Sequence, residues 1–411
     1  MSKIAITNGR VIDPKHGTDT TATLFIADGK IAGLGQPPAG FTADETIDAS
    51  GQVVCPGLID LSARISGIAT ELEAAVAGGV TTLVCPPDIS PILDEAELVE
   101  RLVRRAGDLE LARVLPLGAL TVGLEGERLT EMAALAKAGC VGFSQAKKSV
   151  ADTLSLLRAL EYAATFDFAV WLQPQDYYLA KNGIAHEGEV ASRLGLAGIP
   201  VSAETIAIHT LLTLAADSGV RLHLTRLSSA AGMRMVAEAQ ARGLKVTCDV
   251  AVHHLHLSEH DIGFFDSQAR FAPPLRSGAD RTGLRQGVAA GTALICSDHT
   301  PVDEDDKLLP FGEAKPGATA LELLLPLTLK WAIEDKVALP TALARLTSGP
   351  AAVLGLDAGH LAVGTRADVC IFDPEADWQV KPAALKSWGK NTPYLGYALQ
   401  GKVVRTLING R

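Results

Sequence analysis

The sequence predicts an α/β protein in which a parallel (β/α)8 barrel carries a small β-sandwich made from both chain ends. Three observations support this fold class. The chain has 411 residues, which exceeds one typical domain. Its ends consist of short alternating strands, and its middle alternates short apolar runs with amphipathic stretches. We therefore expect residues 1–52 and 360–411 in the sandwich and residues 53–359 in the barrel.

The two ends share one pattern. From residue 3 to about residue 52, apolar and polar residues alternate between Gly, Asn and Asp turns, as in KIAITNGRVID and ATLFIADGKIAGLG. The pattern returns after residue 360, in HLAVGTRADVCIFDP and GKVVRTLINGR. Such alternation is typical of antiparallel strands that bury one face. This is why we expect both ends to form one β-sandwich.

The middle of the chain has a different pattern. Its apolar runs are TTLVCPP, RVLPLGAL, CVGFS, FAVWLQP, RLHLTRLS, LKVTCDVAV and TALICSDH. Between them lie amphipathic stretches such as ELVERLVRRAG, LTEMAALAKAG and DTLSLLRALEYAATF. Strands that alternate with helices of this length indicate parallel βα units. About eight units fit, which predicts a TIM-like barrel with its site at the carboxyl ends of the strands.

Composition excludes several function classes. A net charge of −10 and a pI near 5.5 argue against a nucleic-acid surface, which needs clustered basic residues. No apolar run reaches the ~18 residues of a membrane span. The N-terminus lacks the apolar core of a signal peptide, so we expect a cytoplasmic protein. Its six cysteines are scattered singly, which is typical of buried thiols in a reducing compartment.

The strand ends are where we expect the chemistry. The stretch VVCPGLIDLSARISG, from Val53 to Gly67, indicates a buried strand that runs into a turn. Alternation places Ser62 and Arg64 on one face, pointing into the barrel mouth. A hydrolytic barrel normally has histidines and carboxylates there, because they hold zinc and ionise a water. This mouth offers other side chains instead: Ser62, Arg64, Gln173 and Arg226.

Several long segments carry a family resemblance: CPGLIDL (55–61), AAVAGGVTTLVCPP (74–87), NGIAHEGEVASRLGLAGIPVSAETIAI (182–208), VTCDVAVHHLHLS (246–258), PPLRSGADRTGLRQGVAAGT (273–292), CSDHTP (296–301) and KNTPYLGYALQGKVVRTLINGR at the C-terminus. Through them the chain resembles the dihydroorotases and allantoinases of the cyclic amidohydrolase superfamily over nearly its whole length. The resemblance implies a metallo-hydrolase barrel with a β-sandwich, which agrees with the fold predicted from the pattern.

The chain departs from this family at the site. The resemblance implies that the family's metal-ligand positions are occupied here by Ser62, Arg64, Gln145, Gln173 and Arg226. The family's acidic pair aligns with Gln145 and Ala146. Its substrate-contacting positions are occupied by Asp88, Ala272 and Val302. Asp298 alone is retained, as the family's metal ligand and general base, next to His299.

A Coulomb estimate predicts that this mouth holds no metal. A guanidinium ~4 Å from Zn²⁺ repels it by about 8 kcal/mol at an effective dielectric constant of ~20, and two arginines stand at ligand positions. A good structural site supplies only ~10–16 kcal/mol. We therefore expect no cofactor and no catalytic residue, Asp298 being a vestigial base. Because an unpaired buried carboxylate is costly, Arg64 or Arg226 should pair with Asp298.

Two functions remain open. The resemblance extends to inactive dihydroorotase-like chains that assemble with the catalytic subunit of aspartate carbamoyltransferase in some bacteria. It implies a non-catalytic subunit that scaffolds or stabilises this enzyme in de novo pyrimidine (UMP) biosynthesis, as a homodimer within a larger complex. The alternative is an active zinc-dependent dihydroorotase or allantoinase-like cyclic amidase. Its rearranged metal site would use Asp298, His299, His223 and the histidines of residues 253–256.

Overall fold

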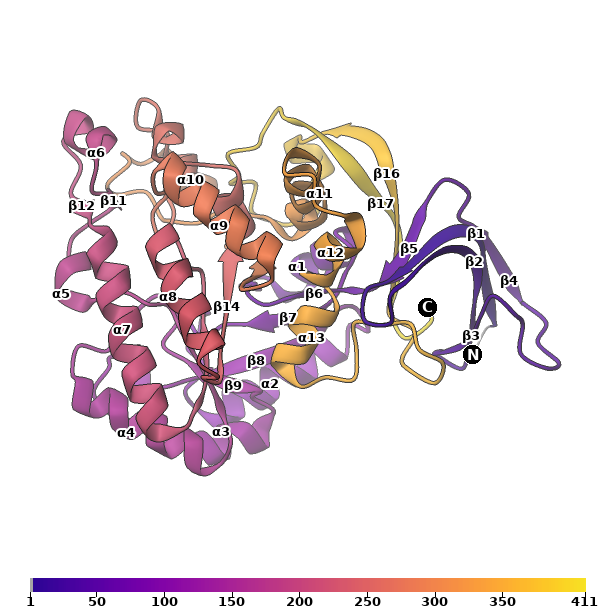
Figure 1. The fold of residues 1–411 in the computed structure, drawn as a ribbon, viewed down its shortest axis with the longest axis horizontal. Coiled ribbons are helices and arrows are strands. Elements are labelled where there is room, and N and C mark those ends of the chain that lie inside the picture. The colour runs from indigo at the N-terminus through magenta and orange to yellow at the C-terminus, as the bar shows by residue number, and fades with distance from the viewer. Residues whose placement is uncertain (1–2) are drawn as a thin grey trace.

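The computed structural model describes residues 3–411, so the first two residues of the predicted segment 1–52 lie outside the described residues. Figure 1 shows the two parts of the molecule. A barrel of parallel strands with helices around it forms the larger part, and a sheet containing both chain ends lies beside it. The predicted fold class is confirmed.

The barrel contains eight parallel strands in the order β15-β14-β13-β10-β9-β8-β7-β6. The seven predicted apolar runs form seven of them: β7 (Val80–Cys85), β8 (Arg113–Ala119), β9 (Gly142–Ser144), β10 (Ala169–Leu172), β13 (Arg221–Leu224), β14 (Val246–Ala251) and β15 (Leu294–Cys296). The eighth, β6 (Leu58–Asp60), comes from the stretch between Val53 and Gly67. An isolated parallel bridge between Ala63 and His299 joins the first and last strand ends. The Arg64 N–H donates to the His299 carbonyl at 2.9 Å. Closure therefore brings the two strand ends together.

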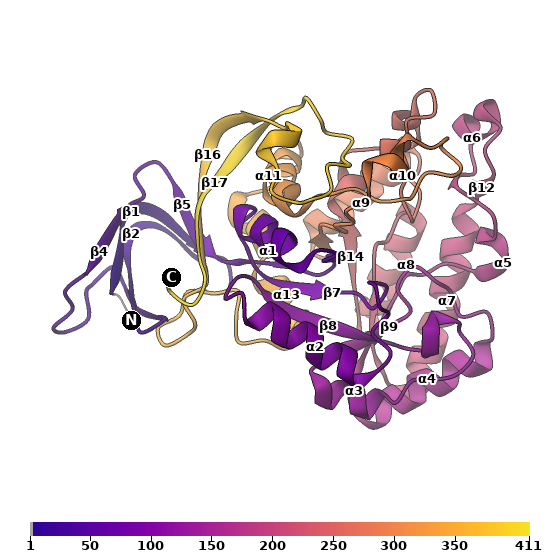
Figure 2. The same ribbon diagram turned by 180° about the vertical axis from the view of Figure 1, so that it is seen from behind.

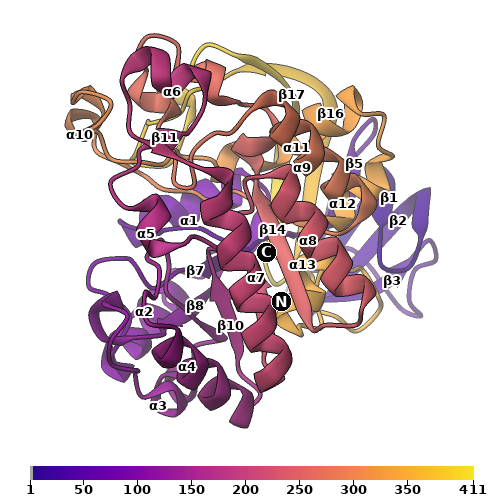
Figure 3. The same ribbon diagram turned by 60° about the vertical axis from the view of Figure 1, so that its left-hand side comes forward.

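Helices cover the outside of the barrel, and Figure 3 shows two of them in front of the strands. The helices between strands are α1 (Ile68–Ala77), α2 (Ala96–Gly107), α3 (Met132–Ala138), α4 (Thr153–Thr165), α7 (Val201–Ser218), α8 (Ala230–Ala241) and α9 (Gly278–Ala290). Three more follow the last strand: α11 (Leu324–Glu334), α12 (Leu339–Ala344) and α13 (Ser348–Leu354). Helix α2 buries Val99, Leu102 and Ala106. This spacing gives it the apolar stripe that packs against the strands.

Short elements lie in the segments that connect the strands and the longer helices. They are α5 (Tyr177–Ala180), α6 (Glu189–Leu194), α10 (Glu304–Leu308), β11 (Ala185–His186), β12 (Gly198–Ile199), η1 (Val122–Leu124), η2 (Val252–Leu255), η3 (Glu259–Ile262), η4 (Ser267–Ala269), η5 (Leu321–Leu323) and η6 (Pro382–Ala384). The run that contains the histidines of 253–256 is thus the 3-10 turn η2 after β14. In the described part of the chain, no helix is long and apolar enough to cross a membrane.

The strands of the two chain ends form one seven-stranded sheet in the order β17-β16-β5-β1-β2-β3, with β4 paired to β1. Figure 2 shows β16 and β17 of the C-terminal end next to the N-terminal strands. Their bounds are β1 (Ile4–Asp13), β2 (Thr18–Ala27), β3 (Lys30–Leu34), β4 (Glu45–Asp48), β5 (Val53–Pro56), β16 (Val369–Gln379) and β17 (Ala398–Leu407). A small core of its own lies within this sheet, around Ile6, Leu24 and Ile371.

The predicted boundaries need two corrections. Strand β5 was expected in the barrel segment 53–359, but it pairs with β1 and β16 in the end sheet. The stretch from Val53 to Asp60 is two strands, because Gly57 interrupts it; a Cβ at Gly57 would lie 2.3 Å from the Thr81 side chain. The second correction concerns the chain between β16 and β17, which leaves the sheet and crosses the barrel, where the Asn391 amide donates to the Thr300 carbonyl at 3.0 Å.

Candidate functional site

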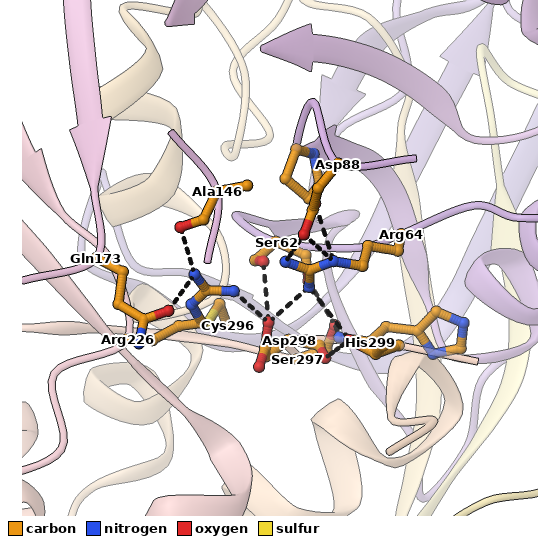
Figure 4. A network of polar contacts seen from close by, with 12 residues as sticks. Ser62, Arg64, Asp88, Ala146, Gln173, Arg226, Cys296, Ser297, Asp298 and His299 are labelled. Atoms are coloured by element: carbon orange, nitrogen blue, oxygen red, sulfur yellow. Dashed lines mark hydrogen bonds and ion pairs between the residues drawn. The ribbon is translucent and has the colours of Figure 1, made fainter. Parts of the chain in front are cut away.

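Three strand ends of the barrel finish in the same unusual backbone conformation. Ala146, Arg226 and Asp298 each lie two residues after a strand, β9, β13 and β15. Their φ angles are 55°, 57° and 46°. Positive φ is uncommon for residues other than glycine and is found at functional sites more often than elsewhere. All three belong to the polar network of Figure 4, which fills the barrel mouth.

Asp298 is the centre of this network. Its Oδ1 accepts hydrogen bonds from Arg64 Nη1 and from Arg226 Nη1, each at 3.0 Å. The Ser62 hydroxyl lies 3.4 Å from the same oxygen. The side chain that the sequence analysis singled out as a retained carboxylate is therefore held by two arginines. The pairing predicted with either Arg64 or Arg226 is found with both.

Arg64 joins Asp298 to a second carboxylate. Its Nε and Nη2 donate to Asp88 Oδ1 and Oδ2 at 3.0 Å, in the two-pronged geometry that guanidinium and carboxylate groups favour. Its Nη1 also donates to the Thr300 hydroxyl at 3.1 Å. Asp88, which we expected only as a substituted substrate position, is thus a partner of Arg64. A single guanidinium therefore donates to groups that follow two different strands, β7 and β15.

Arg226 extends the network to the other side of the mouth. Its Nη2 donates to Gln173 Oε1 at 2.8 Å and to the Ala146 carbonyl at 3.1 Å. Its backbone N–H donates to Asp249 Oδ1 at 2.7 Å, which fixes the strand end below the guanidinium. Gln173 and Arg226, both predicted at metal-ligand positions, therefore contact each other directly.

The remaining predicted positions lie outside the arginine contacts. Gln145 is buried, and its Oε1 accepts from the Thr121 hydroxyl at 3.0 Å. Its Nε2 has no hydrogen-bond partner among the described residues. Val302 donates its backbone N–H to Asn391 Oδ1 at 2.9 Å, so it anchors the crossing C-terminal segment. Ala272 is buried directly before Pro273 and contributes no polar side-chain atom to the mouth.

The charges of the network fix its protonation. Burial raises the pKa of the Asp298 carboxyl, but Arg226 and Arg64 outweigh this and hold that pKa well below its usual range. Asp88 shows the same balance. Burial raises its pKa, but the charge of Arg64 acts in the opposite direction, and the net result is a lowered pKa. At the half-buried rim, burial and the charge of Arg64 lower the pKa of Lys147 to about 7. Both carboxylates are therefore ionised, and both guanidinium groups are charged.

These residues do not fit a divalent metal ion. Two guanidinium groups, at 5% and 2% exposure, contact the Asp298 carboxylate. Asp298 Oδ1 already accepts from both of them. Displacing either arginine from this buried position would leave a charge without a partner. No chemical step through a metal follows from this mouth.

The histidines of the alternative metal site do not converge. His299 Nδ1 accepts from the Ala320 N–H at 3.0 Å, so its Nε2 carries the proton and donates to Glu71 at 2.5 Å. Both ring nitrogens of His223 are also engaged, with the Thr247 hydroxyl at 2.7 Å and with Asp249 at 2.9 Å. Neither ring has a free lone pair for a metal.

The three histidines of η2 have separate surroundings as well. His256 Nε2 contacts the Leu327 carbonyl at 2.8 Å, on the outer side of the turn, and His254 Nε2 contacts the Pro274 carbonyl at 3.3 Å. His253 is fully buried between aromatic rings, stacked on Tyr394 at 5.7 Å. Within residues 3–411, the mouth contains no group of three His, Cys, Asp or Glu side chains close enough to share an ion.

Glu71, which the sequence analysis did not single out, connects the mouth to the C-terminal segment. It is fully buried and accepts from His299, from the Ser387 hydroxyl at 2.8 Å and from the Trp388 N–H at 3.1 Å. We expect Glu71→Ala to lower the free energy of unfolding by at least about 1–3 kcal/mol, because it leaves buried donors without an acceptor. Urea unfolding measures this. Glu73→Ala, on the exposed face of the same helix, should change little.

The depressed pKa values predict acid sensitivity. Asp298 and Asp88 have folded pKa values below their unfolded ones, so they stabilise the protein fully above the unfolded value of about 3.9 and lose this as pH falls. Asp60 acts oppositely: burial raises its pKa to about 6, so its contribution decreases as pH rises from about 4 to 6. Urea unfolding from pH 6 to pH 3 should show a loss of stability below about pH 4 that is smaller in Asp298→Asn.

Comparison with known proteins places these findings in context. The family described as "Dihydro-orotase-like" matches residues 51–232. A "Dihydroorotase-like protein" of Pseudomonas putida is 47% identical, over 99% of this chain and 98% of its own length. One of Pseudomonas aeruginosa is 46% identical over the same shares. A "Dihydroorotase" of Geobacter sp. is 39% identical, again over 99% of this chain and 98% of its own length.

Solved structures agree on the fold. The L-hydantoinase (dihydropyrimidinase) of Arthrobacter aurescens superposes with a TM-score of 0.88 at 24% identity, covering 100% of this chain and 96% of its own. The dihydropyrimidinase of Brevibacillus agri gives a TM-score of 0.86 at 22% identity, with 99% and 94% covered. At this level of identity the likeness establishes the architecture of barrel and end sheet, and the side chains of the mouth must be interpreted from this chain itself.

Proposed function

Because this chain belongs to the dihydroorotase-like proteins of the cyclic amidohydrolase superfamily, we propose that it is a catalytically inactive subunit that scaffolds or stabilises aspartate carbamoyltransferase in de novo pyrimidine (UMP) biosynthesis. One observation carries the proposal. The carboxylate at the position of the family's general base, Asp298, is bound by Arg64 and Arg226.

Asp298 is a poor base in this setting. A general base must accept a proton from a nucleophile within hydrogen-bond reach. Here the Oδ1 atom is occupied by two guanidinium donors, and their charges hold the pKa of Asp298 far below neutral. Without a Lewis acid, a water in the mouth keeps a pKa of about 15.7. Neither partner of a hydrolytic step is activated.

Substrate access is restricted as well. The side chains of the mouth are almost completely buried: Ser62, Arg64, Gln173, Arg226 and Asp298. A cyclic amide would have to break ion pairs between buried charges to reach Asp298, and that costs several kcal/mol. We therefore propose that these buried ion pairs and hydrogen bonds stabilise the barrel and do not bind a substrate.

A scaffolding subunit needs a stable core and an intact outer surface. The barrel keeps both, because all eight strands and the helices around them are present. A mouth filled by ion pairs is compatible with selection for contacts on the outside. The names of the Pseudomonas relatives, "Dihydroorotase-like protein", support a role beside the pyrimidine pathway enzymes. We further propose a homodimer within a larger complex, without a cofactor in the barrel.

Co-production with the carbamoyltransferase catalytic subunit of the same cell tests this role. We expect a complex larger than either chain, measured by light scattering, and higher carbamoyltransferase activity or thermal stability when this chain is present. Ser62→Ala, a mild change inside the mouth, should leave both effects unchanged, because the outer surface is untouched. Equal size, activity and stability with and without this chain would contradict the proposal.

The second candidate function is an active zinc-dependent dihydroorotase or allantoinase-like cyclic amidase. The name of the Geobacter relative, "Dihydroorotase", favours it. It would require zinc ligands in the mouth, and His299 and His223 have no free ring nitrogen to offer. An assay for hydrolysis of dihydroorotate decides between the two functions.

A further inference from the structure

A cluster of side chains that can bind a metal lies outside the barrel mouth, in the region of the end sheet. The sequence contains Asp-Pro-Lys-His at 13–16 and Asp-Ala-Gly-His at 357–360. Each is an Asp-x-x-His motif, and the two are separated by almost the whole chain. The first follows the end of β1, and the second precedes β16. The fold brings them into contact.

The ligating atoms of the two motifs lie within reach of one ion. One atom each of Asp13, His16 and His360 lies within 4.8 Å of the others. Asp13 Oδ2 is 2.8 Å from His16 Nδ1, and Asp357 Oδ1 is 2.9 Å from His360 Nε2. The two imidazole rings meet edge to face, with centroids 5.2 Å apart. His360 Nδ1 accepts from the Ala362 N–H at 3.3 Å. An ion bound at His360 Nε2 would therefore replace the hydrogen bond between this ring and the exposed Asp357.

The inner half of the cluster is held rigidly by the backbone. Asp13, at 2% exposure, accepts from the Lys15 N–H at 3.0 Å and from the Leu361 N–H at 2.9 Å, one from each segment. His360, at 5% exposure, follows Gly359, whose φ is +69° and whose added Cβ would lie 2.5 Å from the Thr347 carbonyl. Only glycine fits this turn. The outer half, His16 and Asp357, is exposed, so an ion can enter from solvent.

We propose that Asp13, His16 and His360 bind a divalent transition-metal ion such as zinc, which ties the N-terminal strand to the C-terminal segment. Two imidazoles and one carboxylate are ligands that zinc accepts, and a water can complete a tetrahedral site. The carboxylates of Asp13 and Asp357 outweigh the ammonium of Lys15, which lies 3.8 Å from Asp357. The local charge therefore favours a dication, in contrast to the arginines of the mouth.

The three ligands come from two chain segments, so a bound ion would hold these segments together. An ion bound to the folded chain and not to the unfolded chain stabilises the fold by mass action. It would link residues that the unfolded chain holds far apart. The inference is independent of the function proposed for the barrel, because the two sites share no residue.

Zinc binding to the full chain tests this site. Wild type, His16→Ala, His360→Ala and the control His209→Ala, which changes an exposed histidine of α7, are stripped with a chelator and dialysed against Zn²⁺. We expect one zinc per chain for wild type and control and none for the two variants. Zinc should also raise the thermal midpoint of wild type and control only, and Co²⁺ should give the visible absorption of a tetrahedral site.

Two outcomes would overturn the proposal. One is the absence of zinc binding by a folded wild-type chain. The other is the same zinc content in all four proteins, which would place the metal elsewhere. His16 has an exposed side chain, so His16→Ala should fold even if His360→Ala does not. Circular dichroism of each stripped protein shows whether the variant is folded, so a loss of zinc binding can be assigned to the missing ligand and not to unfolding. Hydrolysis of dihydroorotate is a separate readout and reports on the barrel alone.

Discussion

Replacing Asp298 with alanine is expected to lower the free energy of unfolding by about 3–5 kcal/mol. The change removes the carboxylate that lies between Arg64 and Arg226, each 3.0 Å from its Oδ1. Arg226 would then have no carboxylate partner in the salt bridges of the described residues, and it is 2% exposed. Two like charges would face each other in a buried mouth. Urea unfolding at pH 7 measures the loss.

Two further variants sharpen this prediction. Asp217→Ala, at an exposed position of α7, is the matched control and should change stability by less than about 0.5 kcal/mol. Adding Arg226→Met to Asp298→Ala should recover part of the loss, because it removes the unpaired charge. If Asp298 were instead a catalytic carboxylate kept at a cost to stability, its removal would leave the free energy of unfolding unchanged or raise it. An Asp298→Ala protein as stable as wild type would contradict a structural role for this residue.

Placing histidines at positions 62 and 64 is not expected to create activity. In the double variant Ser62→His and Arg64→His, the first strand end gains two potential ligands, but Gln173 and Arg226 remain in the mouth. Catalytic groups act as a unit, so partial restoration yields no turnover. Asp88 also loses its two-pronged partner. We expect no hydrolysis of dihydroorotate with added Zn²⁺ and a loss of stability of about 3 kcal/mol or more.

Arg64→Lys provides the graded control for this experiment. An ammonium keeps the positive charge but cannot donate in parallel to both oxygens of Asp88, so its stability should fall between wild type and the double variant. Turnover by the double variant, above that of an equal amount of wild type, would show that the mouth needs only two ligands to bind metal. That result would contradict the interpretation that Arg226 and Gln173 prevent a metal from binding in the mouth.

Much of the barrel could be predicted from the sequence because its signals are local. Each apolar run is long enough for one buried strand, and each amphipathic stretch has the helical period. The side-chain period of two also placed Ser62 and Arg64 on one face, and both contact Asp298. The pairing of Asp298 with an arginine followed from electrostatics alone, since a buried carboxylate requires a counter-charge.

Other features depend on which distant segments meet, and periodicity does not report this. Asp88 follows β7 and Arg64 follows β6, so their contact depends on the pairing of these two strands. The membership of Val53–Pro56 in the end sheet depends on pairing with β16, more than 300 residues later in the chain. The meeting of Asp13 with His360 has the same origin. The sequence contains the two Asp-x-x-His motifs, but it does not show that the fold brings them together.

The most direct test of the central claim is hydrolysis of dihydroorotate at pH 8 by the purified chain with added Zn²⁺, beside an active dihydroorotase treated in the same way. The barrel described here predicts no turnover above buffer, whether or not the end-sheet cluster holds zinc. Turnover that is proportional to protein concentration and disappears in a folded Asp298→Asn variant would contradict it, because it would require Asp298 to act as a base despite its two arginine partners.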